Sequence, residues 1–198
     1  MPSYGIHRAV GAMYLKHNKL TNPEAFMEGI VKPDVLSDLG GESKVKTHFG
    51  YKPKVKEKVK NDFKSKCNLY LYLTSSLPKT DLDMGYFLHL ITDHLWFYRF
   101  LYYPGFEKVY TKKLLYHDYA CVAKEVERVY HVQDGMPPLS WATIEDEPKL
   151  FSRKGMHVFI EYCAKLNLAE LISQILCAKQ HWAEVQMLKN CPNSADFL

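Results

Sequence analysis

The segment 81–103 is the most hydrophobic part of this chain, and it constrains the fold more than any other feature. Nine of the 27 aromatic residues fall between Tyr86 and Phe106. A helix that is apolar on most of its surface is stable only when other elements cover it. Pro104-Gly105 follows the segment and is expected to end the helix. The sequence therefore predicts a central hydrophobic helix that other helices surround.

Apolar residues recur with helical spacing along most of the remaining chain. Further helices are expected over 7–19, 23–32, 54–67, 107–131, 153–166 and 168–189. Residues 34–53 contain several glycines and prolines and are predicted to form a long loop. The segment 68–73 alternates briefly and is compatible with a strand or a helix. The pattern predicts an all-α fold, with residues 1–198 forming a single compact multi-helix domain.

The composition excludes several classes of protein. Of the 198 residues, 47% are hydrophobic and 24% are charged, which suits a globular domain and excludes a disordered chain. No apolar stretch is long enough to span a bilayer, and the start lacks the apolar region of a signal peptide. The five cysteines are widely spaced without a CxxC motif, which favours reduced thiols. We therefore expect a cytoplasmic protein without a transmembrane segment.

Positive charge is concentrated in residues 44–66. This lysine-rich segment holds nine lysines and two acidic residues, a net charge of +7, so the rest of the chain carries −3 of the total of +4. Its lysines are spread around the expected helix, without arginine or interleaved aromatics, so no specific nucleic-acid partner is expected. The segment is interpreted either as a solvated helix or as a surface that attracts anionic substrates.

Histidine and aspartate residues form the strongest chemical pattern. His89 and Asp93 are four residues apart and therefore share one face of the central helix. A carboxylate in such apolar surroundings needs either a partner, for which Arg99 is a candidate, or a metal ion. His7, Asp34 and His48 supply further ligand types from separate segments. The set predicts a metal site built from several helices and a loop.

Three motifs resemble those of the zinc-dependent phospholipase C family. Residues 26–34 (FMEGIVKPD) resemble its F-x-x-G-x-x-x-P-D segment, and residues 47–49 (THF) resemble its T-H-F/W element. Residues 85–93 (GYFLHLITD) resemble its G-x-x-x-H-x-x-x-D helix. The resemblance covers about half of the chain, residues 7–100. It implies an all-helical metal-dependent hydrolase that cleaves phosphoesters with zinc, acting as a phosphodiesterase on a small phosphoester or phospholipid-type substrate.

The resemblance also implies roles for individual residues. Asp34, His48, His89 and Asp93 would hold one zinc ion, and His7 would help to hold a second ion that Asp93 bridges. Asp34 would be either a ligand or the catalytic general base, and the sequence leaves both roles open. One or two ions are therefore expected.

Other candidates extend this site. The family supplies a further H-x-x-x-E/D pair, for which His117/Asp118 and His157/Glu161 are candidates for a second metal site. Arg8 and Arg99 lie close in sequence to the proposed ligands, so each is a candidate phosphate-binding residue or the partner of an acidic side chain.

Two alternative functions remain open at this stage. His117-Asp118 also resembles the dyad of HD-domain phosphohydrolases, with His89 or His94 before it and Asp134 or Asp146 after it. The fold could instead hold a degraded site and serve as a non-catalytic metal-binding protein. The oligomeric state is not predicted.

Overall fold

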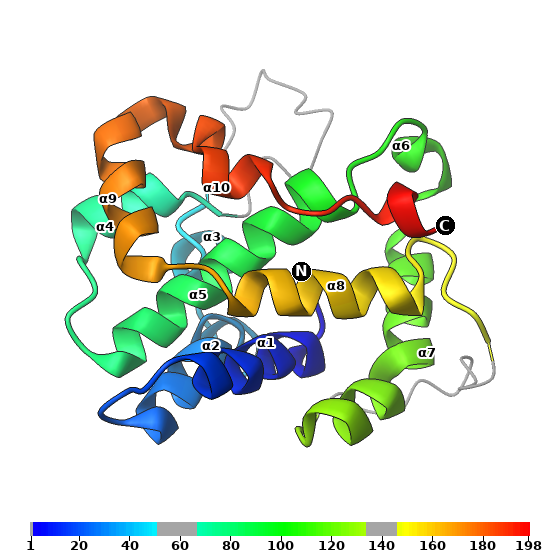
Figure 1. Ribbon diagram of the computed structural model, residues 1–198, viewed down its shortest axis with the longest axis horizontal. Helices are drawn as coiled ribbons and strands as arrows, with labels where there is room; N and C mark the ends of the chain where they lie inside the picture. Colours follow the sequence, from blue (N-terminus) through cyan, green and yellow to red (C-terminus); the bar gives the residue numbers. More distant parts are fainter. Residues whose placement is uncertain (1, 51–66, 134–145) are drawn as a thin grey trace.

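The computed structural model describes residues 2–50, 67–133 and 146–198, and within these ranges it contains helices and no strand (Figure 1). The all-α prediction is thereby confirmed. The α-helices are α1 (Tyr4–His17), α2 (Pro23–Asp38), α3 (Lys44–Thr47), α4 (Leu69–Ser75), α5 (Asp81–Leu95), α6 (Phe106–Val109), α7 (Lys112–Tyr130), α8 (Arg153–Ala164), α9 (Leu168–Ala178) and α10 (Gln186–Lys189). Among the described helices, none combines the length and apolar character that crossing a bilayer requires.

Helix α5 is the central element, as the hydrophobic segment predicts. It runs through the middle of the molecule, and α2 and α1 lie along one side of it (Figure 1). The helix continues into a π-helical turn, Trp96–Phe100, before the chain leaves it. Trp96 and Phe100 are fully buried and pack against Phe151 and Phe159 of the C-terminal half. The aromatic residues at this end of α5 therefore form core.

Two glycines allow α2 and α5 to touch through their backbones. A methyl group added at Gly29 would lie 2.1 Å from the carbonyl oxygen of Leu82, and one at Gly85 would lie 2.1 Å from that of Phe26. No side chain fits at such a distance, so only glycine permits this approach. The close crossing brings Asp34 of α2 to the same region as the polar residues of α5.

The predicted loop over 34–53 is wrong in its first part. Helix α2 continues through the buried Pro33 to Asp38, and the short helix α3 follows. Proline removes an N–H donor and crowds the carbonyl of residue i−4, and the burial of Phe26, Gly29 and Ile30 of the same helix offsets that cost. Asp34 therefore lies on a helix and not after one. Within the predicted loop, only residues 34–50 belong to the described part of the chain.

Several predicted boundaries also move. The segment 68–73 is part of helix α4, and the predicted helix 107–131 is divided into α6 and α7. The predicted helix 168–189 ends at Ala178, because Lys179 has a φ of +50°, which interrupts helical geometry. The helix expected over 54–67, apart from its last residue, and most of the lysine-rich segment lie outside the described residues.

Local sequence sets the start of α5. The Thr80 hydroxyl accepts a hydrogen bond from the backbone N–H of Asp83, and the Asp83 carboxylate accepts one from the backbone N–H of Thr80. Replacing Thr80 by Ala should lower the free energy of unfolding by ~1 kcal/mol, whereas Thr80→Ser should retain most of the stability because it keeps the capping oxygen. Chemical denaturation of both variants measures the difference. Equal stability of the two would contradict this role of the cap.

Candidate metal centre

The structure brings together five of the residues that the sequence singles out. His7 comes from α1, Asp34 from α2, His48 from the C-terminal end of α3, and His89 and Asp93 from α5. Each of the five is at most 2% exposed to solvent. These residues form the His/Asp centre.

Asp93 lies in the middle of the His/Asp centre. Its Oδ1 atom is 3.3 Å from His7 Nε2, whereas its Oδ2 atom is 3.4 Å from His48 Nε2 and 3.8 Å from His89 Nε2. On the other side, His48 Nε2 is 3.3 Å from Asp34 Oδ1. The two carboxylates therefore approach the same imidazole nitrogen from different helices.

Backbone carbonyls orient two of the histidines. His89 Nδ1 lies 2.8 Å from the carbonyl oxygen of Ile30, and His48 Nδ1 lies 3.1 Å from that of Lys44 and 2.8 Å from the Thr47 hydroxyl. A carbonyl oxygen only accepts hydrogen bonds, so protons on the Nδ1 atoms satisfy both carbonyls and leave Nε2 of each ring free to bind a cation. These two Nε2 atoms are 3.2 Å apart. A proton or a metal cation between them removes the repulsion of facing lone pairs.

His7 and Asp93 add buried polar atoms that lack hydrogen bonds. The His7 ring stacks on the His89 ring with 3.8 Å between centroids. Within the described residues, neither nitrogen of His7 and neither carboxylate oxygen of Asp93 makes a hydrogen bond. Buried polar atoms without partners are costly in a native structure. A ligand to these atoms would offset that cost.

The electrostatic environment favours the forms of these residues that bind metals. Burial opposes the ionisation of Asp34, but its contact with His48 and the nearby His89 lower the pKa of the carboxyl to about 2. Asp93 behaves similarly: the contacts with His7, His89 and His48 outweigh burial and hold its pKa below the ordinary value. Burial and the charge of His7 lower the pKa of His89 to about 3. The aspartates are therefore ionised and His89 is neutral near pH 7.

These residues form two overlapping groups that can hold a metal ion. One group is His7, His89 and Asp93, and the other is Asp34, His48 and His89. Within each group, the ligand atoms lie within 4.8 Å of one another. The donor set of imidazole nitrogens and carboxylate oxygens suits a divalent cation.

A cation also borders the His/Asp centre. Lys44 Nζ lies 3.4 Å from Asp34 Oδ1 and 3.4 Å from Asp38 Oδ1. Its side chain is 46% exposed, so it connects the buried carboxylate of Asp34 with solvent. The start of the lysine-rich segment therefore lies beside the centre.

The structure gives the two candidate phosphate-binding arginines backbone partners. Arg8 donates a hydrogen bond to the carbonyl oxygen of Gln133, and Arg99 donates one to that of Ala183 at 2.7 Å. The pairing of Asp93 with Arg99 that the sequence left open is not formed in the described part of the chain. Asp93 faces histidines instead.

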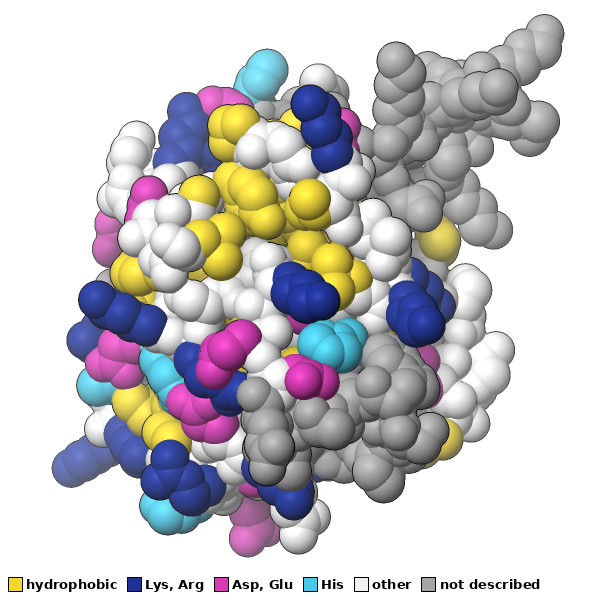
Figure 2. Space-filling model, turned by 90° about the vertical axis from the view of Figure 1, so that its right-hand side faces the viewer, with side chains coloured by type: hydrophobic (Ala, Val, Ile, Leu, Met, Phe, Trp, Pro, Cys, Tyr) yellow, Lys and Arg dark blue, Asp and Glu magenta, His cyan; other side chains and the backbone are white. Residues whose placement is uncertain are grey.

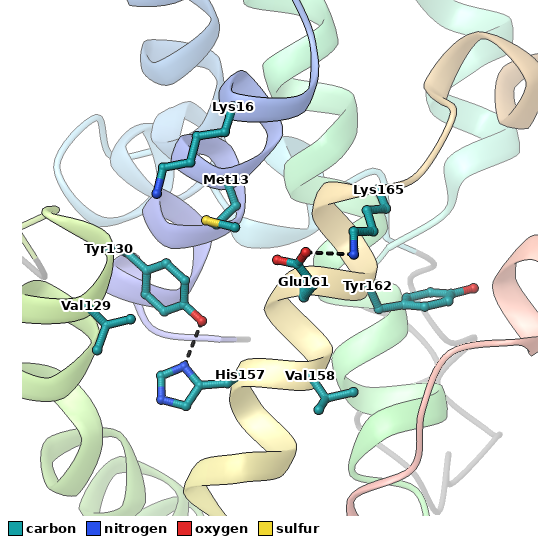
Figure 3. Close-up of a pocket in the computed structure, with 9 residues that line it drawn as sticks. All are labelled: Met13, Lys16, Val129, Tyr130, His157, Val158, Glu161, Tyr162 and Lys165. Carbon is teal, nitrogen blue, oxygen red and sulfur yellow. Dashed lines mark hydrogen bonds and ion pairs between the residues drawn. The ribbon is translucent and has the colours of Figure 1, made fainter.

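His157 and Glu161 do not pair with each other. Both line an open cavity of about 650 Å³ between α1, α7 and α8, together with Tyr130 and Lys165 (Figure 3). His157 contacts the Tyr130 hydroxyl and Glu125, each at 2.7 Å, whereas Glu161 contacts Lys165 at 2.7 Å. The structure therefore places this predicted pair outside the His/Asp centre.

His117 and Asp118 also form a separate cluster. Their ring and carboxylate contact each other at 3.1 Å, and His117 Nε2 lies 3.4 Å from Asp146. Neither His89 nor His94 belongs to the metal-ligand group that contains these residues in the described chain. His94 is buried against Tyr98 and Trp182 instead. Asp134 lies outside the described residues.

The sequence interpretation missed Cys121. The sequence predicts only a reduced thiol at this position, but the sulfur lies 3.6 Å from His117 Nδ1. The spacing of four residues between His117 and Cys121 on a helix is the signal that identifies this contact from sequence. All five cysteines of the chain are free thiols.

Comparison with known proteins identifies no relative of this chain. No family model, curated protein or solved structure matches the chain.

Proposed function

We propose that this protein is a divalent-metal-dependent phosphoester hydrolase, of the phospholipase C-like type, that uses zinc. One observation carries the proposal: the Nε2 atoms of His48 and His89 face each other at 3.2 Å beside the two buried carboxylates of Asp34 and Asp93. Imidazole nitrogens and buried carboxylates that converge in this way are well suited to a divalent cation. A zinc ion held there would act as a Lewis acid on a phosphoryl oxygen and lower the pKa of a bound water toward ~7.

Individual residues would bind that ion through different atoms. His48 and His89 would bind through Nε2, because their Nδ1 protons are held by backbone carbonyls. Asp93 presents one oxygen toward His7 and the other toward His48, so its carboxylate can serve two adjacent positions. The centre would therefore hold one or two ions, and Asp93 would be a ligand that they can share.

Asp34 is better suited to ligation than to general base catalysis. A general base works best when its pKa lies near the operating pH. The pKa of Asp34 is lowered to about 2, so this carboxylate holds a proton poorly at neutral pH. Its Oδ1 atom also points at His48 Nε2, which is itself a proposed ligand. We therefore assign Asp34 as a metal ligand.

The surrounding charge favours an anionic substrate. Lys44 lies beside Asp34 and is partly exposed, and eight further lysines follow within the lysine-rich segment. A positive region near a metal centre raises the local concentration of phosphoesters and weakens with added salt. A small phosphoester or phospholipid-type substrate fits this charge.

Metal analysis combined with turnover tests the function. Purified protein should contain at least one zinc ion per chain and hydrolyse bis-p-nitrophenyl phosphate. Chelation should abolish this hydrolysis, and added zinc should restore it. Replacing His48 by Ala should lower the metal content by at least one ion per chain and abolish the activity, whereas His181→Ala, at an exposed histidine, should change neither. Elemental analysis and absorbance of nitrophenolate give the two measurements.

The outcomes separate the alternative functions. Bound zinc without turnover on a panel of phosphomonoesters and phosphodiesters would refute the enzyme and leave a non-catalytic metal-binding protein. Metal and turnover that persist in His48→Ala and disappear in His117→Ala would overturn the His/Asp centre in favour of an HD-type site.

A further inference from the structure

A second cluster of metal-ligand side chains lies on one turn of α7, apart from the His/Asp centre. Cys121 lies one turn after His117 (i, i+4) and Asp118 (i, i+3), a spacing that brings its side chain near both. His117 Nδ1 lies 3.1 Å from Asp118 Oδ1 and 3.6 Å from Cys121 Sγ. The three ligand atoms are all within 4.8 Å of one another. This group shares no residue with the His/Asp centre.

These separations suit a tetrahedral zinc ion. Zinc bonds of ~2.05 Å to nitrogen, ~2.1 Å to oxygen and ~2.3 Å to sulfur imply ligand separations of about 3.4 Å for N···O and about 3.6 Å for N···S. The observed values of 3.1 Å and 3.6 Å are close to both.

Outer contacts hold the ligands in place. The carboxylate of Asp146 lies 3.4 Å from His117 Nε2 and can accept the proton of that nitrogen when Nδ1 binds an ion. The other oxygen of Asp118 accepts hydrogen bonds from the backbone N–H groups of Lys149 and Leu150, at 2.8 Å and 2.6 Å. Carboxylate contacts to the far side of a ligating histidine, and hydrogen bonds to a ligating carboxylate, are typical of metal sites.

Charge and burial also favour a cation. Asp118 and Cys121 are fully buried, whereas Asp146 is about half exposed and His117 partly so, which leaves an entry from solvent. Arg153 lies nearby, but it forms ion pairs with Glu125 and Glu147. The cluster is therefore negative where an ion would bind.

We propose that His117, Asp118 and Cys121 form a zinc site, with Asp146 orienting the histidine. The thiolate selects zinc over magnesium or calcium, which prefer oxygen ligands. An ion there would connect α7 to the residues that hold Asp118, at 149–150, so its role would be structural. Figure 2 shows the side of the molecule that lies at the right in Figure 1. Histidine, acidic and basic side chains lie close together in the lower half of this view, whereas hydrophobic side chains gather in its upper half.

Cobalt substitution tests the site independently of hydrolysis. Cobalt bound to a thiolate gives a near-ultraviolet charge-transfer band, and the ligands of the His/Asp centre include no sulfur. The full chain titrated with Co²⁺ should show this band at one equivalent per chain, and Zn²⁺ should displace it. Cys121→Ser should abolish the band and lower the metal content by one ion per chain. Cys177→Ser, at an exposed cysteine, should retain both.

Two further variants keep the proposal falsifiable. Asp146→Asn lies at an exposed position and should weaken zinc binding at this site by ~10–100-fold without unfolding the protein. His48→Ala should leave the band intact, so failure of the His/Asp centre and failure of this site give different results. Absence of the band from the wild type, or its persistence in Cys121→Ser, would overturn the zinc site. Unchanged affinity in Asp146→Asn would overturn the role of Asp146.

Discussion

Replacing Asp93 by Asn should abolish metal binding at the His/Asp centre and reduce phosphodiester hydrolysis by more than ~10²-fold. Even outer contacts to metal ligands are worth 10–100-fold, and Asp93 is the carboxylate that lies between His7 and His48. An amide carries no charge and offers only one oxygen, so it can neither neutralise the charge of a divalent ion nor bind with two oxygens as a carboxylate does. Elemental analysis and steady-state hydrolysis, compared with the exposed variant Asp196→Asn, measure the two effects.

Thermal unfolding gives a readout of the same variant that does not depend on the substrate. Zinc at a hundred times its dissociation constant should stabilise the wild type by ~2.7 kcal/mol, which corresponds to a rise in Tm of about 5–10 °C for a chain of this length. Asp93→Asn should show no such rise from this centre. Its metal-free form should be less stable than the metal-free wild type, because the contacts with His7, His48 and His89 favour the ionised carboxylate in the fold, so the zinc-dependent rise is measured against the metal-free form of each variant. A full zinc-dependent rise in Asp93→Asn would exclude Asp93 as a ligand.

Replacing Gly85 by Ala should destabilise the fold by ~1–3 kcal/mol or more, through overpacking at the crossing of α2 and α5. The added methyl would meet the backbone carbonyl of Phe26 at 2.1 Å, and a backbone atom moves only if its helix moves. Alanine normally favours a helix over glycine by ~1 kcal/mol, so the loss occurs against an intrinsic gain. Denaturant titration measures the change.

Gly11→Ala is the matched control for this effect. Its methyl would meet two side chains, Met27 Sδ at 2.8 Å and Ile30 Cγ1 at 3.0 Å, and no backbone atom of another helix; the flexible Met27 can rotate away. The control should therefore cost less stability than Gly85→Ala. If Gly85→Ala and Gly11→Ala have equal stability, the backbone contact between α2 and α5 does not limit their approach.

The crossing also links stability to the site. It holds Asp34 of α2 within reach of His48, while His89 of α5 donates its Nδ1 proton to the Ile30 carbonyl of α2. Any separation of the two helices lengthens that hydrogen bond and displaces the ligands on α2 from those on α5. Gly85→Ala should therefore weaken metal binding even in molecules that remain folded.

Local sequence predicted the features that depend on neighbouring residues. The apolar spacing predicted helices, and the central position of 81–103 followed from its hydrophobicity. The helix expected from residue 23 begins there in the structure, where the Asn22 side chain accepts a hydrogen bond from the Ala25 N–H. These features could be predicted because each is determined within one or two turns of the chain. The spacing of His89 and Asp93, and the resemblance of the motifs around them, likewise identified candidate ligands.

Only the tertiary structure decided which of those candidates meet. It continued α2 through Pro33, interrupted the last predicted helix at Lys179, and placed His157 with Glu125 instead of Glu161. It also fixed the imidazole protons of His48 and His89 through carbonyls from Lys44 and Ile30. The physical reason is that packing between distant segments sets these contacts, and no local spacing encodes it. The sequence by itself determined the helices and the ligand types, whereas the fold determined the centre that they form.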